Sequence, residues 1–275
     1  MLHAPFSKWD PSGNVTILMP EGLGLPSAAL TAWALDPRRA GGEQAGFCDE
    51  AARAMRMAGG EFCVNATRCF GAWLALREER AGKPAGEGSA RVYVVRVSGW
   101  DDPVSLSVEG RAPSWFVTAS LVVTLPEPEV PAPGARVLRL PGITHVLVDE
   151  RVIPLPSDPM AAGREMMASL DLLGEPACGV VWWREGDGGP AITPIVRVRD
   201  IDTLFAEKAC GSGSMALALL LAREGGGRRF DVRQPSGDAL TVTLDDWIDG
   251  AMAVHVSGRV RLTLEGTLPI PDGAL

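Results

Sequence analysis

The sequence predicts an α+β protein built from two pseudo-symmetric lobes, each a mostly antiparallel sheet wrapped around one buried helix. Strand-like and helix-like segments recur through all 275 residues. The stretches 59–78 and 207–225 repeat one local pattern: a glutamate shortly before a cysteine, small or polar residues, an apolar helix-like run and a closing Arg-Glu. The runs at 70–76 and 215–222 are apolar on nearly every side, and a helix of that kind is buried all round. One such helix in each half of the chain gives two similar lobes.

β-Branched and aromatic residues mark the strands that would wrap these helices. In the first half we expect strands at 14–19, 91–97, 115–118 and 121–125. In the second half we expect strands at 137–140, 144–148, 178–183 and 195–198, a helix at 159–173, and strand-like alternation through 251–268. Residues 126–134 hold four prolines, which disfavour any regular element. We therefore expect an irregular linker there, at the boundary between the lobes.

Composition and charge exclude several classes of function. With 46% hydrophobic residues the chain can bury a core, and with a net charge of −8 and no basic stripe it is a poor partner for nucleic acid. The longest apolar run, 215–222, is far shorter than the roughly 20 residues of a membrane span, and no signal peptide is evident. We therefore expect a cytoplasmic protein with no membrane partner.

The five cysteines are not arranged for disulfides or for zinc. Their number is odd, no Cys-x-x-Cys pair occurs, and the three histidines are dispersed along the chain. We expect reduced thiols, no metal and no organic cofactor. Cys48, Cys69 and Cys178 are interpreted as small core residues. Cys63 and Cys210, which open the two repeated helices, are the candidates for chemistry.

A cysteine at a helix start has chemistry that a core cysteine lacks. The unpaired N–H groups and the positive end of the helix dipole bind a carboxylate and favour a thiolate, which predicts a lowered thiol pKa. Small residues after each cysteine let a substrate approach the backbone. An α-carboxylate held between the two helix starts would place its Cα–H between Cys63 and Cys210. One thiolate could remove the proton from one face while the other thiol delivers a proton to the opposite face, which inverts the stereocentre.

Two other functions remain open at this point. A cysteine hydrolase would need a histidine beside its nucleophile, and His145 is the one histidine in a strand expected to be buried. A non-catalytic amino-acid-binding protein would keep the cleft without the proton transfer. The role of Glu207 is open as well, because it could contact the substrate or lie in a solvated turn.

The cysteine motifs resemble those of the diaminopimelate epimerase-like superfamily of cofactor-independent amino-acid racemases and epimerases. Residues 63–69, Cys-Val-Asn-Ala-Thr-Arg-Cys, are similar to that family's Cys-Gly-Asn-Gly-x-Arg-Cys. Residues 209–213, Ala-Cys-Gly-Ser-Gly, are similar to its second motif, Ala-Cys-Gly-Thr/Ser-Gly. The resemblance implies the two-lobed fold and a last strand that crosses back to the N-terminal lobe. The implied lobes are 1–127 plus 264–275, which carries the first cysteine motif, and 128–263, which carries the second.

The resemblance also implies which residues meet the substrate. Cys63 and Cys210 would be the acid–base pair. Residues near the two motifs would hold the α-carboxylate and the rest of the substrate: Asn14, Gln44, Val64, Asn65, Glu207, Gly211 and Ser212. The implied partner is a free amino-acid substrate, and a homodimer is left open as the assembly.

Departures from the family pattern bear on the substrate. Diaminopimelate epimerases carry an arginine for the distal carboxylate eight to nine residues before the second cysteine, where residues 201–203 read Ile-Asp-Thr. Two family asparagines that face the distal group correspond here to Ile143 and Ala177. Diaminopimelate is therefore the less expected substrate. Val64 replaces a family glycine and would be strained if that position needed a positive φ.

Within the superfamily, the sequence is most similar to the histidine racemases of staphylopine-type metallophore biosynthesis. The likeness is carried by residues 6–18, 43–47 and 61–63 and by the glutamate three residues before Cys210. It implies a free amino acid with a short or aromatic side chain, histidine first, as the substrate. The predicted function is thus a cofactor-independent two-base racemase, with a diaminopimelate epimerase or a binding protein of the same fold as the alternatives.

Overall fold

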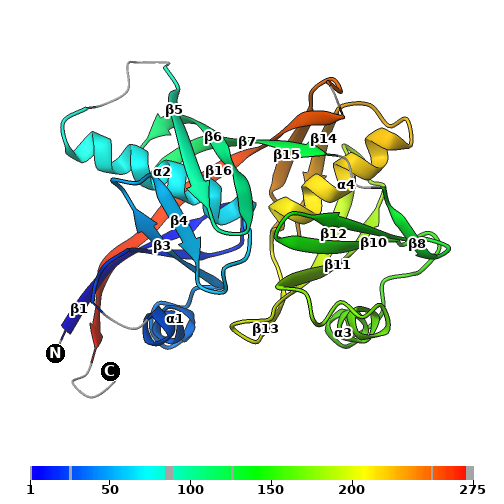
Figure 1. Cartoon of the computed structure of the whole chain (residues 1–275), viewed down its shortest axis with the longest axis horizontal. Coiled ribbons are helices and arrows are strands. Elements are labelled where there is room, and N and C mark those ends of the chain that lie inside the picture. Colours follow the sequence, from blue (N-terminus) through cyan, green and yellow to red (C-terminus); the bar gives the residue numbers. More distant parts are fainter. Residues whose placement is uncertain (1, 25–26, 84–88, 125–126, 249, 271–275) are drawn as a thin grey trace.

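The computed structural model describes residues 2–24, 27–83, 89–124, 127–248 and 250–270, which form two halves lying side by side (Figure 1). The helices of these residues are α1 (Ser27–Leu35), α2 (Val64–Arg80), α3 (Pro159–Ser169) and α4 (Gly211–Arg223). The strands up to the middle of the chain are β1 (Leu2–Asp10), β2 (Thr16–Pro20), β3 (Gln44–Asp49), β4 (Ala54–Met57), β5 (Arg91–Val97), β6 (Trp100–Arg111) and β7 (Ser114–Thr124). The later strands are β8 (Glu129–Ala132), β9 (Ala135–Leu140), β10 (Ile143–Asp149), β11 (Ala177–Arg184), β12 (Ala191–Val198), β13 (Thr203–Ala206), β14 (Arg229–Arg233), β15 (Ala239–Leu244) and β16 (Ala251–Ile270).

Eight strands of the first half close into a barrel around α2. β1 to β7 pair in chain order, β7 pairs with β16, and β16 pairs back with β1. α2 contacts strands on all sides of this barrel, including β2, β5, β7 and β16, and residues 64–76 are buried without a break. The helix can be apolar all round because strands, not water, surround it.

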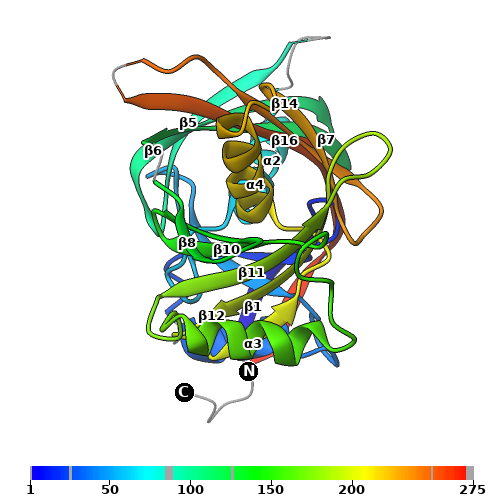
Figure 2. The same cartoon turned by 90° about the vertical axis from the view of Figure 1, so that its right-hand side faces the viewer.

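The second half is a curved sheet that holds α4 on its inner side. From β16 the strand order continues through β15, β14, β12, β11, β10, β9 and β8, and β13 pairs with the side of β12. α4 contacts β10, β14, β15 and β16, and residues 211–220 are buried. Figure 2 shows α4 enclosed by these strands and α3 outside them. The expectation of one buried helix within each half is met in the placement of α2 and α4.

The outer helices α1 and α3 pack on strand faces that point away from the inner helices α2 and α4. Side chains alternate between the faces of a strand. Leu18 therefore packs inward with α2, whereas Ile17 and Met19 pack outward in the cluster that includes α1. On β11, Val181 packs with α4 while Val180 packs with α3. This alternation fixes which strand residues can reach the inner helices.

The sequence predicted the mixed α and β class correctly, but it gave no helix at α1 and no strand at eight places: β1, β3, β4, β6, β8, β13, β14 and β15. Of these, β8 lies where an irregular linker was expected. Residues 129–132, within the expected irregular linker, form β8, which pairs with β9 at Glu129↔Val137 and Ala132↔Ala135 through an irregular register. β8 is a fully exposed edge strand, the position at which a sheet tolerates proline. Residue 125, the last of a predicted strand, and residue 126, the first of the predicted linker, lie outside the described residues. In the ranges that the structure describes, no helix has the length and apolar character needed to cross a membrane.

Candidate functional site

Cys63 and Cys210 occupy the same position, the N-cap, of the two inner helices. Cys63 precedes α2 with φ −134° and ψ 109°, and its Sγ accepts a hydrogen bond from the N–H of Ala66 at 3.4 Å. Cys210 precedes α4 with φ −130° and ψ 103°, and its Sγ accepts from the N–H of Gly213 at 3.3 Å. An N-cap side chain folds back over the first turn of its helix. Each sulfur therefore lies beside the free N–H groups of a helix start.

A hydroxyl four positions after each cysteine secures the first turn. Thr67 Oγ1 donates a hydrogen bond to the carbonyl oxygen of Cys63 at 2.8 Å. Ser214 Oγ donates in the same way to the carbonyl oxygen of Cys210 at 2.7 Å. The two helix starts thus share their backbone conformation, their sulfur cap and their hydroxyl bond, although their sequences differ.

The two helix starts meet in one narrow cleft between the halves. The cleft is lined by Asn14, Gln44, Glu61, Phe62, Cys63, Val64, Asn65, Ile143, Ala177, Val196, Val198, Glu207, Cys210, Gly211 and Ser212. Its volume is only about 30 Å³. A free amino acid would therefore enter only if the walls of the cleft moved apart.

All nine residues predicted to form the site line this cleft. Two hydrogen bonds connect four of them across long stretches of chain. Asn14 Nδ2 donates to Glu207 Oε1 at 3.1 Å, which joins the first half to the second. The Cys63 thiol donates to Gln44 Oε1 at 3.0 Å, which holds the sulfur toward β3. Glu207 is thus a wall of the cleft and not a solvated turn residue.

A buried arginine fixes the first turn of α2. Arg68 has no exposed surface and donates to Asn65 Oδ1 at 3.1 Å, to the carbonyl oxygen of Arg259 at 3.0 Å and to that of Pro11 at 3.5 Å. Asn65 in turn donates through Nδ2 to the carbonyl oxygen of Ala209 at 3.0 Å. The arginine therefore holds a cleft residue that itself contacts the segment leading into α4.

A glutamine supports each cysteine, and the sequence identified one of the two. Gln44 accepts from the Cys63 thiol and donates to Thr16 Oγ1 at 2.7 Å. Gln234 accepts from the N–H of Cys210 at 2.9 Å and donates to the Ser214 hydroxyl at 2.9 Å. No role was predicted for Gln234 from the sequence.

Burial dominates the electrostatics of the thiols. It raises the pKa of Cys63 to about 12, with the charge of Glu207 as the second cause. Burial and then the charge of Glu207 also raise the pKa of Cys210 well above its ordinary value. Burial raises the pKa of Glu207 itself to about 7. The prediction that a helix start would lower the thiol pKa was therefore wrong, because the N–H bonds from Ala66 and Gly213 are outweighed.

His145 and Val64 bear on alternatives that the sequence left open. His145 is buried, and its Nε2 lies 2.9 Å from Ser212 Oγ instead of bonding to a cysteine. Burial lowers the pKa of His145 to about 4. The histidine–cysteine hydrogen bond of a cysteine hydrolase is therefore not formed by this residue. Val64 begins α2 and is not among the residues with positive φ, so the strain considered for this position does not arise.

Four cleft residues were missed as part of the site: Glu61, Phe62, Val196 and Val198. Glu61 and Phe62 directly precede Cys63, so their closeness in sequence was an available signal. Val196 and Val198 come from β12, and nothing local in the sequence indicates which strand borders the cleft. Within the described ranges, no group of three or more His, Cys, Asp or Glu side chains is placed to hold a metal ion.

Known proteins resemble the chain over nearly its whole length. A family described as the histidine racemase CntK N-terminal domain matches residues 3–268. A histidine racemase of Fusobacterium nucleatum subsp. nucleatum is 24% identical, over 94% of this chain and 97% of its own. Among solved structures, a hydroxyproline epimerase from Agrobacterium vitis with bound trans-4-hydroxy-L-proline has a TM-score of 0.67 and 16% identity, covering 98% of this chain and 91% of that one. A phenazine biosynthesis protein of the PhzF family from Enterococcus faecalis has a TM-score of 0.61 and 16% identity, covering 98% and 100%.

The two kinds of similarity establish different things. The solved structures share the mixed α and β fold with this chain at low sequence identity. The family match covers almost every described residue, including both cysteine motifs and all nine predicted site residues. The chain therefore belongs to the histidine racemase family and is an isomerase of the amino-acid racemase type.

Proposed function

We propose that this racemase inverts histidine at Cα without a cofactor, using Cys63 and Cys210 as its two acid–base groups. The observation that carries the proposal is the matched placement of the two sulfurs at the N-caps of two helices that open into one cleft. Each sulfur accepts one backbone N–H and leaves the neighbouring N–H groups of its helix start free for a ligand. A single carboxylate bound by both helix starts would lie between the two thiols.

The proposed reaction balances without a co-reactant. The substrate carboxylate would bind at the N–H groups of 64–65 and 211–212, where backbone donors stabilise the charge that develops on deprotonation. A thiolate on one side takes the Cα proton and becomes a thiol. The thiol on the other side gives its proton to the opposite face of the carbanion and becomes a thiolate. The two sulfurs have then exchanged protonation states, and the reverse reaction or proton exchange with solvent restores the first state.

The charge of the substrate would offset the raised thiol pKa values. The carboxylate of Glu207 disfavours a second negative charge on either sulfur. A substrate α-ammonium placed beside Glu207 would cancel this effect and favour the thiolate. Asn14, which already donates to Glu207, would hold that carboxylate in position. Deprotonation of the thiol would in this way depend on the presence of an amino acid.

Diaminopimelate is the weaker substrate candidate. No lysine or arginine is among the residues that line the cleft, and Ile143 and Ala177 present apolar surface. A second substrate carboxylate would be desolvated there without a partner, which is costly. A short or aromatic side chain suits these walls better. The use of the product in metallophore biosynthesis is part of the proposal and rests on the sequence resemblance alone.

We also infer that the halves are pseudo-symmetric lobes, 1–127 plus 264–275 and 128–263, that part to admit the substrate. The shared conformation of the two cysteine caps supports this relation. β16 pairs with β15 in one half and with β1 in the other, so any opening motion has to bend this strand or shift its partners. A homodimer and a cytoplasmic location stay predictions from the sequence, and light scattering tests the first.

Exchange of the Cα proton in D₂O tests the proposed function. The reduced protein is incubated with L-histidine, with LL-diaminopimelate and with a panel of other L-amino acids, and Cα deuteration and chirality are followed by NMR and chiral chromatography. We expect deuteration with inversion of histidine and none of diaminopimelate. Inversion of diaminopimelate would contradict the substrate assignment, and exchange with no amino acid in a folded sample would favour a binding protein.

Serine variants test the thiol pair in the same assay. We expect Cys63→Ser and Cys210→Ser each to lower racemisation by about 100- to 10,000-fold, the usual contribution of a positioned acid or base. Cys48→Ala is the matched control, because Cys48 is a buried cysteine that does not line the cleft. Full activity in either serine variant would contradict the assignment.

A further inference from the structure

Glu61 is a buried carboxylate that the reaction described above does not use. It is 6% exposed, it lines the cleft, and its Oε2 has no hydrogen-bond partner. Burial is the main cause of the raised pKa of Cys63 and of Glu207, and the charge of Glu61 adds to both. A buried carboxylate oxygen without a donor is costly. Such a group in a cleft is accounted for when a ligand supplies the donor.

The backbone around Glu61 is held firmly, and its Oε2 lies beside Gly59, where an added Cβ would be 2.7 Å away. Ser98 Oγ donates to the carbonyl oxygen of Glu61 at 2.9 Å and accepts from the N–H of Met57 at 2.9 Å. Gly99, with φ +71°, lies so close that a Cβ there would be 2.4 Å from the nitrogen of Phe62. Gly142 abuts the same place, since a Cβ on it would be 2.8 Å from the Cβ of Phe62. Glu61 is therefore a fixed part of the cleft wall.

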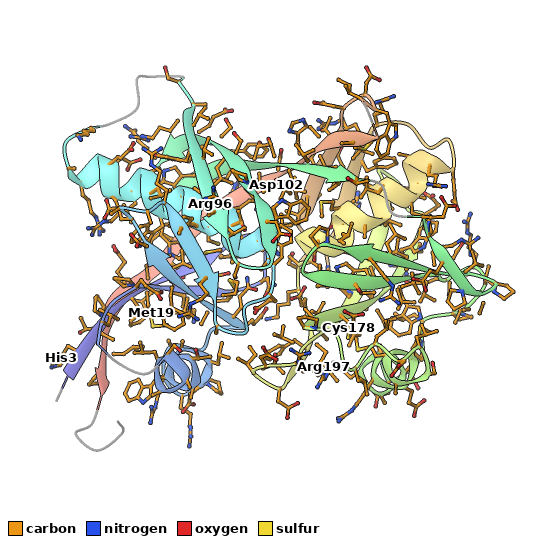
Figure 3. All side chains as sticks on the ribbon, in the orientation of Figure 1. His3, Met19, Arg96, Asp102, Cys178 and Arg197 are labelled. Atoms are coloured by element: carbon orange, nitrogen blue, oxygen red, sulfur yellow. The ribbon has the colours of Figure 1, made fainter. Side chains whose placement is uncertain are left out.

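The rest of this wall is apolar and carries no positive charge. Phe62, Val196 and Val198 line the cleft with Glu61, together with the apolar residues already described. Arg197, between the two valines of β12, faces the opposite side of the strand and donates to the carbonyl oxygen of Leu173 at 2.8 Å. Figure 3 shows Arg197 and Cys178 on the α3 side of the second half. No basic side chain of the protein is thus available to Glu61 among the residues that line the cleft.

The α-carboxylate and α-ammonium of an amino acid would leave Glu61 without a partner in the cleft. In the proposed reaction the α-carboxylate binds the helix starts and the α-ammonium binds Glu207. Oε2 of Glu61 then stays without a donor unless the side chain of the substrate brings one. We infer that Glu61 selects the substrate side chain by accepting a hydrogen bond from a ring N–H, which an imidazole provides and a purely apolar ring does not. This inference rests on the proposed function for the placement of the backbone groups of the substrate.

Ligand binding by calorimetry tests this role separately from catalysis. The probes are L-histidine and 3-(2-thienyl)-L-alanine, whose five-membered ring is of similar size but has no N–H. We expect the wild-type protein to bind histidine about 10- to 100-fold more tightly, the range for a hydrogen bond to a charged group. In Glu61→Met, which keeps the side-chain length without an acceptor, we expect the ratio of the two Kd values to fall to about 1. Glu61→Gln, which keeps an acceptor without the charge, should give an intermediate ratio.

The ratio of affinities is insensitive to a partly unfolded sample, because both ligands report on the folded fraction only. If Glu61→Met does not fold, a ratio in Glu61→Gln at least about threefold below that of the wild type supports the role. The control is Glu50→Gln, which changes an exposed carboxylate paired with Arg77 and should keep the wild-type ratio. An unchanged ratio in the Glu61 variants, or no preference for histidine in the wild type, overturns the inference.

Cα exchange with the same ligands separates this inference from the proposed function. If the protein exchanges the Cα proton of histidine but the ratio of the two Kd values is unchanged in the Glu61 variants, the racemase proposal stands and the role of Glu61 is overturned. If the ratio of the two Kd values falls in the Glu61 variants but the protein exchanges no Cα proton, the role of Glu61 in binding stands and the racemase proposal is overturned. If a folded, reduced sample neither binds histidine nor exchanges its Cα proton, both proposals are overturned.

Discussion

Gly211, the first residue of α4, lies directly against Val64, the first residue of α2. A Cβ on Gly211 would be 2.8 Å from the Cβ of Val64 and 3.0 Å from Oδ1 of Asn65. Carbon atoms cannot approach so closely, and a Cβ is too near the backbone to swing away. The two helix starts, and with them the two cysteines, are therefore held at a separation that only a glycine at this position allows.

We predict that Gly211→Ala forces the helix starts apart and weakens both folding and activity. The expected loss of unfolding free energy is about 1–3 kcal/mol, as for other overpacked sites. The measurement is denaturant unfolding together with the racemisation rate. Gly174→Ala is the control, because a Cβ there meets no atom within 4 Å.

A second substitution shows whether contact with Val64 is the cause. Removing the Val64 side chain in Val64→Gly also removes the clash, so the double variant should be more stable than the sum of the single effects by on the order of 1 kcal/mol. Strict additivity of the two effects would contradict direct contact between these residues.

We predict that Arg68→Met is strongly destabilising. Its guanidinium has no exposed surface and donates to three acceptors. The methionine would remove all three hydrogen bonds, and among the residues that the structure describes only the carbonyl oxygen of Arg259 would keep another side-chain donor, Ser12 Oγ at 3.3 Å. The expected cost is about 2–4 kcal/mol. Thermal and denaturant unfolding measure it, and Arg38→Met, in an exposed pair with Asp36, should cost less than about 1 kcal/mol. Equal stabilities of the two variants would show that the buried contacts of Arg68 contribute little.

Much of the candidate site could be predicted because its chemistry is local in the sequence. The cysteine, the small residues after it and the apolar helix form one contiguous pattern, and the pattern occurs twice. The place of Asn14 and Gln44 followed from a family resemblance and not from spacing. By contrast, Val196 and Val198 reach the cleft only because β12 borders it, and strand order depends on pairings far apart in the sequence.

Two wrong predictions, the direction of the thiol pKa shift and the absence of a strand at β8, have the same cause. Both depend on the three-dimensional surroundings of the residues, which the local sequence does not give. The thiol pKa was predicted from the helix start alone, but burial and the charge of Glu207 decide its direction. β8 was missed because prolines disfavour strands in general, whereas an exposed edge tolerates them. In both cases the local rule was sound and the surroundings overrode it.

We predict that Glu207→Gln makes the Cys63 thiol more reactive at mildly alkaline pH. Burial is the main cause of the raised pKa of Cys63 and persists in the variant, but the second cause, the charge of Glu207, is lost. A lower thiol pKa means more thiolate at a given pH, so alkylation by iodoacetamide at pH 9 should be faster. Cys210→Ser serves as the common background, because the other cysteines are buried to within 2%. Equal or slower alkylation in the Glu207→Gln protein would contradict this electrostatic account.

The distribution of deuterium between substrate and product tests the two-thiol mechanism most directly. L-Histidine is incubated with the wild-type enzyme in D₂O, the reaction is stopped at low conversion, and the Cα isotope is read separately for each enantiomer. Two facing thiols predict that the D-histidine formed carries deuterium at Cα while the recovered L-histidine keeps its protium, because the product face receives its proton from a sulfur equilibrated with solvent. The same asymmetry should hold when D-histidine is the substrate. Product that keeps the protium of the substrate would show that one group moves the proton between both faces, and would contradict the assignment of Cys63 and Cys210 as an acid–base pair.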